Sequence, residues 1–347
     1  MEYVGIDVHK GECQVCVVDD EGTIQREFRF RTTTAELTRR LEKYTGSRVL
    51  IEASTESEWV ARCLESLKLE VIVANPNYAL MYAARQQKVK TDRADAHALA
   101  QACRLKLYKP AHRMSDEQRR ARKQLAARAL LVRQRTKMVN FVRAQLRQLG
   151  TPVPSCEVEQ FVVKVRGMTL PDEERVLVER LLTVVDSIQS EVDALDEKLQ
   201  ELTSTDERVQ RLTTVPGVGA VTAAAFIALV WDVARFRTAH QLEAYLGLVP
   251  SERSSGGKEQ KGRITKTGDA YMRTLLVQCA HTIMRRRNAA NAGLYDWAKK
   301  VESRSSKQVA VVALARKLAG ILFAMWRDEK EFDSKKQPRC AEEKTAA

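Results

Sequence analysis

The 347-residue sequence lacks the features that mark membrane proteins and disulfide-stabilised secreted proteins. No apolar run approaches the roughly 18 residues that a membrane-spanning helix needs. The charged start Met1-Glu2-Tyr3 predicts the beginning of a strand rather than a secretion signal. The seven cysteines are scattered and odd in number, which argues against a disulfide framework. We therefore expect a folded cytoplasmic protein of two or three domains.

Two further deficits concern metal-binding cysteines and acidic residues. Cys13 and Cys16 have CxxC spacing, but no second Cys/His pair follows nearby, and a structural zinc site needs four ligands, so we do not expect zinc. Asp and Glu number 45 against 58 Lys and Arg, a formal net charge of +13. Such an excess points to a polyanionic partner, with nucleic acid as the leading candidate.

The first 110 residues alternate strand and helix patterns. Helices are expected at 33–44 and 57–67, and strands at 3–9, 13–18, 24–30, 48–52 and 70–74. Three strands in a meander followed by alternating helix and strand predict a mixed α/β sheet. Sheets of this kind place their functional sites at the carboxyl ends of strands.

Four acids are candidates for such a site. Asp7 lies within the first strand, Glu52 ends the fourth, and Asp92 and Asp95 are three residues apart in a helix that Thr91 is expected to cap. Oxygen-rich clusters suit Mg²⁺, and two such ions can hold both oxygens of a phosphoryl transfer. The alternative is that each acid is a surface carboxylate, with Asp92 and Asp95 stabilised by the helix dipole.

The segments that carry these acids resemble the DEDD pattern of the bacterial insertion-sequence transposases of the IS110 family. They are Gly5-Ile6-Asp7-Val8-His9-Lys10, Ile51-Glu52-Ala53-Ser54 and Lys90-Thr91-Asp92-Arg93-Ala94-Asp95-Ala96. The resemblance implies an RNase H-like (RuvC-like) fold for residues 1–112. It also implies that the four acids are catalytic and bind Mg²⁺.

Residues 113–206 predict a helical, coiled-coil region. Ten Lys/Arg and no acid lie between Gln118 and Gly150, a pattern typical of phosphate binding. The candidates for nucleic-acid contact are Arg128, Arg133, Arg135 and Lys137. The alternative is a solvated charged face on a packing helix.

The second long helix of this region, from about residue 172, is acidic. Apolar residues recur in steps of three and four, which predicts a coiled-coil seam of Leu177, Leu181, Val184, Ile188, Val192, Leu195, Leu199 and Leu202. The basic and acidic helices can pair within one chain or across a dimer, and periodicity does not choose between these. The family resemblance implies a homo-oligomer, a dimer or tetramer.

Residues 207–330 predict a mostly helical domain, with helices at 270–287 and 307–328 and a polar tail at 331–347. Near its start, the turn Pro216-Gly217-Val218-Gly219 resembles a helix-hairpin-helix. In that motif Gly217 and Gly219 would let backbone N–H groups approach a DNA phosphate. The alternative is an ordinary turn between two helices.

Residues 245–273 combine hydroxyls, glycines and cations. A serine in this segment can attack phosphorus while Lys258, Arg263, Lys266 and Arg273 neutralise phosphate charge, or the segment is a basic loop that only binds backbone. Its Gly-Leu-x-Pro, Ser-Gly and Gly-x-Ile-x-Lys-x-Gly pattern resembles the C-terminal domain of the same transposases. The resemblance implies that Ser255, rather than its neighbour Ser254, is the nucleophile.

The resemblance therefore implies a bacterial, nucleoid-associated DNA recombinase. It implies a covalent phosphoserine at Ser255, Mg²⁺ at the acids, and an element-encoded structured RNA that pairs with DNA. A hydrolytic Holliday-junction-type endonuclease, with a C-terminal domain that only binds DNA, explains the N-terminal half equally well. A second alternative is a non-catalytic nucleic-acid bridging protein, but that function gives no role to Asp7 within the first strand. A weaker alternative is a sugar-kinase-like ATPase, but this sequence shows no Gly-rich phosphate loop to support it.

Overall fold

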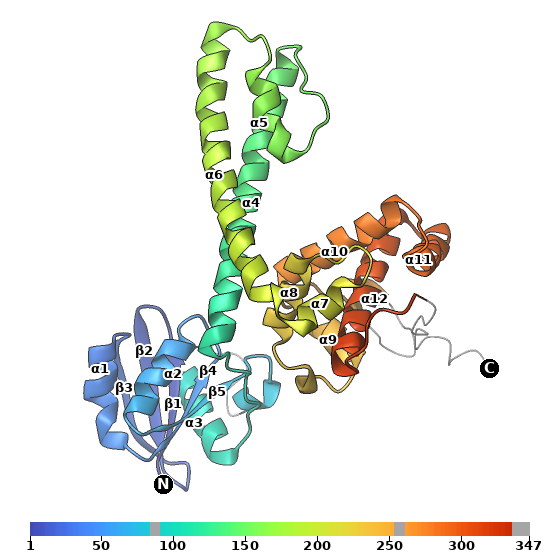
Figure 1. Ribbon diagram of the computed structural model, residues 1–347. Coiled ribbons are helices and arrows are strands. Elements are labelled where there is room, and N and C mark those ends of the chain that lie inside the picture. Colours follow the sequence, from blue (N-terminus) through green and yellow to red (C-terminus); the bar gives the residue numbers. More distant parts are fainter. Residues whose placement is uncertain (84–90, 253–260, 335–347) are drawn as a thin grey trace, which may run out of the picture. The chain divides into compact units, whose positions relative to one another are not determined.

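The chain forms two compact units, residues 1–115 and 116–347 (Figure 1). The computed structural model describes residues 1–83, 91–252 and 261–334. The first unit is a mixed α/β unit and the second is mostly helical, as the sequence pattern predicts.

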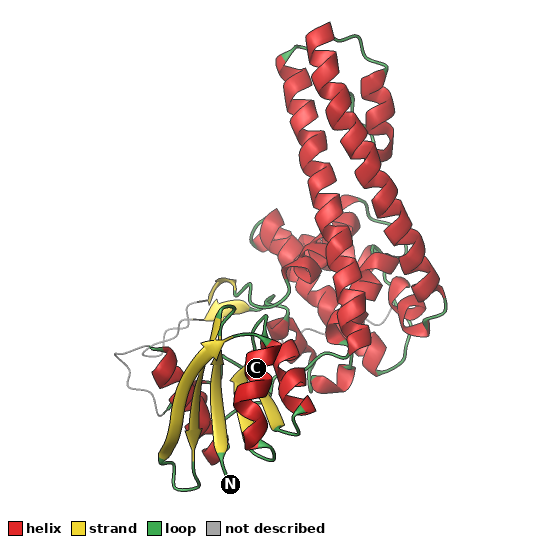
Figure 2. Cartoon of the chain, turned by 90° about the vertical axis from the view of Figure 1, so that its left-hand side faces the viewer, coloured by secondary structure: helices red, strands yellow, loops and turns green. Residues whose placement is uncertain are grey.

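A five-stranded sheet organises the first unit, and Figure 2 draws its strands in yellow. The strands lie in the order β3-β2-β1-β4-β5. The first three strands form an antiparallel meander, and β4 and β5 run parallel to β1. The prediction of a mixed sheet is confirmed. The strands are β1 (Tyr3–Val8), β2 (Glu12–Val18), β3 (Ile24–Arg31), β4 (Arg48–Glu52) and β5 (Glu70–Ala74).

Helices cover both faces of this sheet because successive strand residues point to opposite sides. Val49 and Ile51 of β4 pack into the core that includes buried residues of α1 (Thr34–Leu41) and α2 (Ser57–Ser66). Leu50, between them, packs on the other side with α3 (Asp92–Leu105). The short helices η1 (Glu42–Tyr44) and η2 (Ala79–Tyr82) complete the unit.

The second unit begins with a helical hairpin. Helices α4 (Asp116–Gln148) and α6 (Asp172–Ser204) lie side by side, and α5 (Val158–Arg166), in the connection between them, packs against this end of the hairpin (Figure 1). The basic and acidic helices thus pair within one chain, which is one of the two arrangements that periodicity allows.

The predicted seam of α6 is wrong in its first half. Val178, Leu182 and Val185 are buried against α4 and α5, whereas the predicted Leu177 and Val184 are 50% and 41% exposed. Two apolar rows lie next to each other on this helix, and both recur in steps of three and four. Periodicity cannot choose between such rows, because the choice depends on where the partner helices contact α6.

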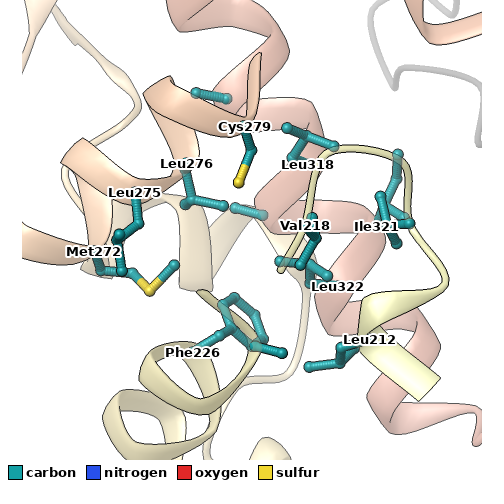
Figure 3. Close-up of a cluster of buried hydrophobic side chains, with 14 of the residues drawn as sticks. Leu212, Val218, Phe226, Met272, Leu275, Leu276, Cys279, Leu318, Ile321 and Leu322 are labelled. Atoms are coloured by element: carbon teal, nitrogen blue, oxygen red, sulfur yellow. The ribbon is translucent and has the colours of Figure 1, made fainter. Parts of the chain in front are cut away.

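Helices of the C-terminal half of the second unit surround one large apolar core. Figure 3 shows Leu212, Val218 and Phe226 packed against side chains of α10 and α12. The helices are α7 (Glu207–Thr213), α8 (Ala220–Val230), α9 (Ala239–Tyr245), α10 (Ala270–Arg285), α11 (Ala292–Arg304) and α12 (Lys307–Arg327). A short helix η3 (Val233–Arg235) and a two-stranded antiparallel sheet of β6 (Pro250–Glu252) and β7 (Lys261–Ile264) complete it.

Helix α12 corrects the expectation about apolar runs. By length and composition alone, its 21 residues would be enough to cross a membrane. However, Leu314, Leu318 and Leu322 are fully buried, and the helix packs against α9, α10 and α11. It is therefore apolar because it supplies the core of this unit.

Candidate functional site

Two of the predicted acids lie at the same edge of the sheet. The pairing of β1 with β4 places Ile6 opposite Ile51, so Asp7 and Glu52 each follow this pair by one residue. Because the two strands are parallel neighbours, their carboxyl ends meet at one edge. The placement that the strand pattern predicts for these two acids is confirmed.

Helix α3 brings the other two acids toward this edge. The side chain of Thr91 caps the helix by accepting a hydrogen bond from the Ala94 N–H at 3.2 Å, as predicted, and Asp92 and Asp95 lie in the first turn. The helix can approach β1 closely because Gly5 has no side chain. A Cβ at Gly5 would lie 2.2 Å from the Ala96 carbonyl oxygen.

His9 lies between two of these acids. Its Nε2 is 3.1 Å from Asp7 Oδ2 and 3.5 Å from Asp92 Oδ1. One donor atom from each of the three residues lies within 4.8 Å of the other two. The structure therefore contains a compact group of two carboxylates and one imidazole at the end of β1.

The electrostatics of Asp7 reflect burial and crowding by like charges. Its side chain is only 13% exposed. Burial raises the pKa of Asp7 above its ordinary value, His9 opposes this, and Asp95 and Asp92 raise the pKa further. Both effects disfavour the charged form of Asp7, and a bound cation would offset them.

Glu52 is held by a tyrosine from η2. The Tyr82 hydroxyl donates a hydrogen bond to Glu52 Oε2. The pKa of Tyr82 is raised, first by burial and then by Glu52, with smaller contributions from Asp95 and Asp7. Asp95 itself is 8% exposed. The four acids are thus linked electrostatically through Asp7 and Tyr82.

The donor set fits a divalent cation that prefers oxygen ligands. Asp7 and Asp92 each offer carboxylate oxygens close to His9 Nε2, and Asp95 is close enough to act on the pKa of Asp7. One carboxylate oxygen of Glu52 accepts the hydrogen bond from the Tyr82 hydroxyl.

Three residues of this site were not singled out by sequence reasoning. His9 follows Asp7 by two residues, and strand alternation would place both side chains on one face, so a signal for it existed. Gly5 carried a weaker signal, as a glycine within a buried strand. Tyr82 carried none, because its contact with Glu52 joins residues 30 positions apart.

The predicted nucleic-acid-binding residues of α4 fall into two pairs. Arg128 forms an ion pair with Asp196 of α6, with Nη2 at 2.8 Å from Oδ2, and this contact raises the pKa of Arg128. Arg135 donates a hydrogen bond to Gln189. Arg133 and Lys137 are exposed and form no ion pair within the described part of the chain. These last two are therefore the cations of the set that are free to meet phosphate.

The predicted helix, turn and helix are present as α7, the turn that follows it, and α8. The two glycines of the turn differ in environment. Gly217 has φ of 82°, and a Cβ there would lie 3.1 Å from the Cys279 carbonyl oxygen, so this glycine serves packing against α10. At Gly219 a Cβ would meet nothing within 4 Å, and the residue caps the N-terminus of α8. The open space at Gly219 leaves room for the backbone of a binding partner to approach the start of α8.

The basic segment of the C-terminal half, residues 245–273, contains β6 and β7. Ser255 and Lys258 belong to residues 253–260, outside the described residues. Arg263 and Lys266 are exposed. Arg273 instead donates hydrogen bonds to the carbonyls of Leu246 at 3.0 Å and Thr267 at 2.9 Å, and so holds together the two segments that flank this sheet.

Glycines allow those segments to cross. A Cβ at Gly247 would lie 2.1 Å from the Thr267 carbonyl oxygen, and one at Gly268 would lie 2.0 Å from the Tyr245 carbonyl oxygen. The close backbone approach that the glycines predict therefore exists here between two protein segments.

The CxxC pair cannot share one metal ion. Cys13 packs into the core on the α1 and α2 face of the sheet, and Cys16 packs on the α3 face. Residues three apart on a strand point to opposite faces. Burial raises the pKa of Cys16 to about 12, so this thiol stays protonated.

Comparison with known proteins finds two family models that match this chain. A family model of the DEDD type, described as a transposase, matches residues 4–151, and one described as the transposase IS116/IS110/IS902 family matches residues 209–296. A probable family 20 transposase of Pseudomonas aeruginosa is 30% identical over 336 residues, covering 94% of this chain and 96% of the relative.

Other relatives are similar over most of their lengths. The transposase for insertion sequence element IS1111A of Coxiella burnetii is 27% identical, covering 94% of this chain and 89% of the relative. The transposase for insertion sequence element IS1328 of Yersinia enterocolitica is 28% identical, covering 93% of this chain and 96% of the relative.

Proposed function

Because the chain belongs to the IS116/IS110/IS902 family of transposases, and so acts in the transposition of an insertion sequence, we propose that it joins DNA strands by a serine mechanism assisted by the acidic site. The observation that carries the acidic part is the convergence of Asp7, Asp92 and His9 within 4.8 Å. In the proposal, Ser255 attacks a DNA phosphate and the four acids act on that same phosphate.

The acidic site would hold Mg²⁺ through Asp7, Glu52, Asp92 and Asp95. When bound, the ion supplies neutralisation of the charge that develops during phosphoryl transfer. The chain's own contribution is to fix these carboxylates: the capped start of α3 places Asp92 and Asp95, and Tyr82 orients Glu52. An RNase H-like fold is the corresponding proposal for residues 1–112, supported by the strand order and by acids at adjacent parallel strand ends.

Ser255 would serve as the nucleophile. Its hydroxyl oxygen would form a bond to phosphorus as one bridging P–O bond breaks, leaving a phosphoserine and a free DNA hydroxyl. A second DNA hydroxyl would reverse the step and release the serine. Arg263 and Lys266, both exposed, would neutralise phosphate charge together with Lys258, whereas the contacts of Arg273 support a role in holding the flanking segments.

Nucleic-acid binding is proposed for the helical parts. Arg133 and Lys137 of α4 are exposed cations, and Gly219 leaves the start of α8 open. We propose that residues 113–206 form a binding and assembly region and residues 207–330 the serine domain, with a homo-oligomer as the acting species. A structured guide RNA in the bacterial cytoplasm would choose the DNA sequence. This fits a chain rich in phosphate binders, because contacts to phosphate carry no sequence information themselves.

One experiment separates this proposal from a hydrolytic junction resolvase. The full-length protein is incubated with nicked or branched DNA, labelled at its ends, in the presence of Mg²⁺, and denaturing gels are examined for a protein-DNA adduct. We expect an adduct from wild type and none from Ser255→Ala, with strand joining reduced on the order of 1,000-fold or more.

Matched variants sharpen this test. Ser254→Ala removes the neighbouring hydroxyl and should retain the adduct, while Asp7→Asn should lose strand joining without losing DNA binding. Cleavage by Ser255→Ala at a rate near that of wild type, with no adduct from either protein, would replace the serine mechanism by hydrolysis at the acidic site.

A further inference from the structure

His9 is held at its position by backbone contacts in the turn between β1 and β2. Its N–H donates to the Glu12 carbonyl at 3.1 Å, and its own carbonyl accepts from the Thr32 hydroxyl at 2.7 Å. The backbone of His9 is thus fixed by hydrogen bonds to β2 and to the residue that follows β3. Its imidazole therefore extends from an anchored point next to Asp7.

The distances around the imidazole match those between neighbouring ligands of a metal ion. Two adjacent ligands of an octahedral ion, each about 2.1 Å from the ion, lie about 3.0 Å apart. His9 Nε2 lies 3.1 Å from Asp7 Oδ2 and 3.5 Å from Asp92 Oδ1. An ion among these three atoms would therefore need only small adjustments of the side chains.

The other basic side chain near Asp92 cannot act as a metal ligand. Arg29 Nη2 is 3.8 Å from Asp92 Oδ2 and 2.5 Å from Glu12 Oε2. A guanidinium has only donors, whereas a neutral imidazole has a nitrogen lone pair that can bind a metal. Of these two basic groups beside Asp92, His9 is the one that can change from a hydrogen-bond partner into a ligand.

We propose that His9 is a direct ligand of the divalent cation at the acidic site, and that its nitrogen shifts the preference of the site toward Mn²⁺ relative to Mg²⁺. The inference rests on the metal site of the proposed function. Mg²⁺ prefers a shell of oxygen ligands, whereas imidazole suits transition metals. A ligand shell with one imidazole would still accept Mg²⁺. It would bind Mn²⁺ more tightly than a shell of carboxylates and water alone would.

The test uses Mn²⁺ and the full-length protein. Electron paramagnetic resonance measures Mn²⁺ binding, its pulsed form detects a nitrogen bonded to the ion, and competition measures Mg²⁺ affinity. His9→Ala removes an exposed imidazole, so the fold should persist, which circular dichroism checks. The matched control is His281→Ala, which removes an exposed imidazole from α10 in the other unit.

We expect a nitrogen signal from wild type and from His281→Ala but not from His9→Ala. The His9 variant should bind Mn²⁺ about tenfold more weakly or worse, and its Mg²⁺ affinity should fall by a smaller factor. Bound Mn²⁺ without a nitrogen signal in wild type, or a signal that survives in His9→Ala, would overturn the role of His9 and leave the acidic site standing. Failure of wild type to bind either ion would instead overturn the metal site itself.

Discussion

Gly5 lies where α3 crosses β1, and Gly5→Ala tests whether this crossing positions the acids. The added Cβ would lie 2.2 Å from the Ala96 carbonyl oxygen and 2.3 Å from the Ala100 nitrogen. Both are backbone atoms in the middle of a helix, so no side-chain rotation can relieve the overlap. The helix itself must move away from the sheet.

The size of the effect follows from these distances. Ordinary contacts require α3 to shift by about 1 Å, and overpacking of this kind destabilises a folded protein by about 1–3 kcal/mol. The same shift would move Asp92 and Asp95, which begin the helix, relative to Asp7. A misplacement of about 1 Å at a catalytic site can lower the rate by about 100-fold.

Urea unfolding, Mn²⁺ affinity and DNA strand joining measure the two consequences separately. Gly11→Ala is the matched control, because a Cβ at Gly11, in the turn after β1, would meet nothing within 4 Å. Its stability should stay within about 0.5 kcal/mol of wild type. If Gly5→Ala matched wild type in stability and in Mn²⁺ affinity, the role of this glycine in positioning α3 would be refuted.

The remaining predictions concern Asp7 and the basic helix. Burial raises the pKa of Asp7, so the folded state binds the proton more strongly than the unfolded state, and stability should fall as the pH rises from the ordinary carboxyl range through the raised pKa. Measured as a melting temperature, this pH-dependent fall should be absent from Asp7→Asn. A fall in that variant as large as in wild type would contradict the assignment to Asp7. Neutralising Arg133 and Lys137 should lower the salt slope of nucleic-acid binding by about 0.7–0.9 for each phosphate that the protein no longer neutralises, with stability unchanged. An unchanged salt slope in the Arg133 and Lys137 double variant would show that α4 serves packing rather than nucleic-acid binding. Arg128→Gln should instead lower stability, because Asp196 loses its ion-pair partner.

Local sequence patterns determined most of the elements of this protein. The alternation of apolar residues predicted the strands of the first unit, and the steps of three and four predicted the long helices. The convergence of Asp7 and Glu52 was also predictable, because parallel neighbouring strands end at one edge. Thr91 was predictable as a cap, since its hydroxyl satisfies a backbone N–H three residues away.

The tertiary structure alone decided which of two similar surfaces is buried. In α6 the rows that contain Leu177 and Val178 have the same periodicity, and contact with α4 and α5 buries only the second. Likewise, Arg128 and Arg133 are equivalent in the sequence, but only Arg128 faces an acid of α6. Tyr82 became part of the site through a contact across 30 residues. Periodicity is a property of one segment, whereas burial, ion pairing and the geometry of a site depend on which distant segments meet it.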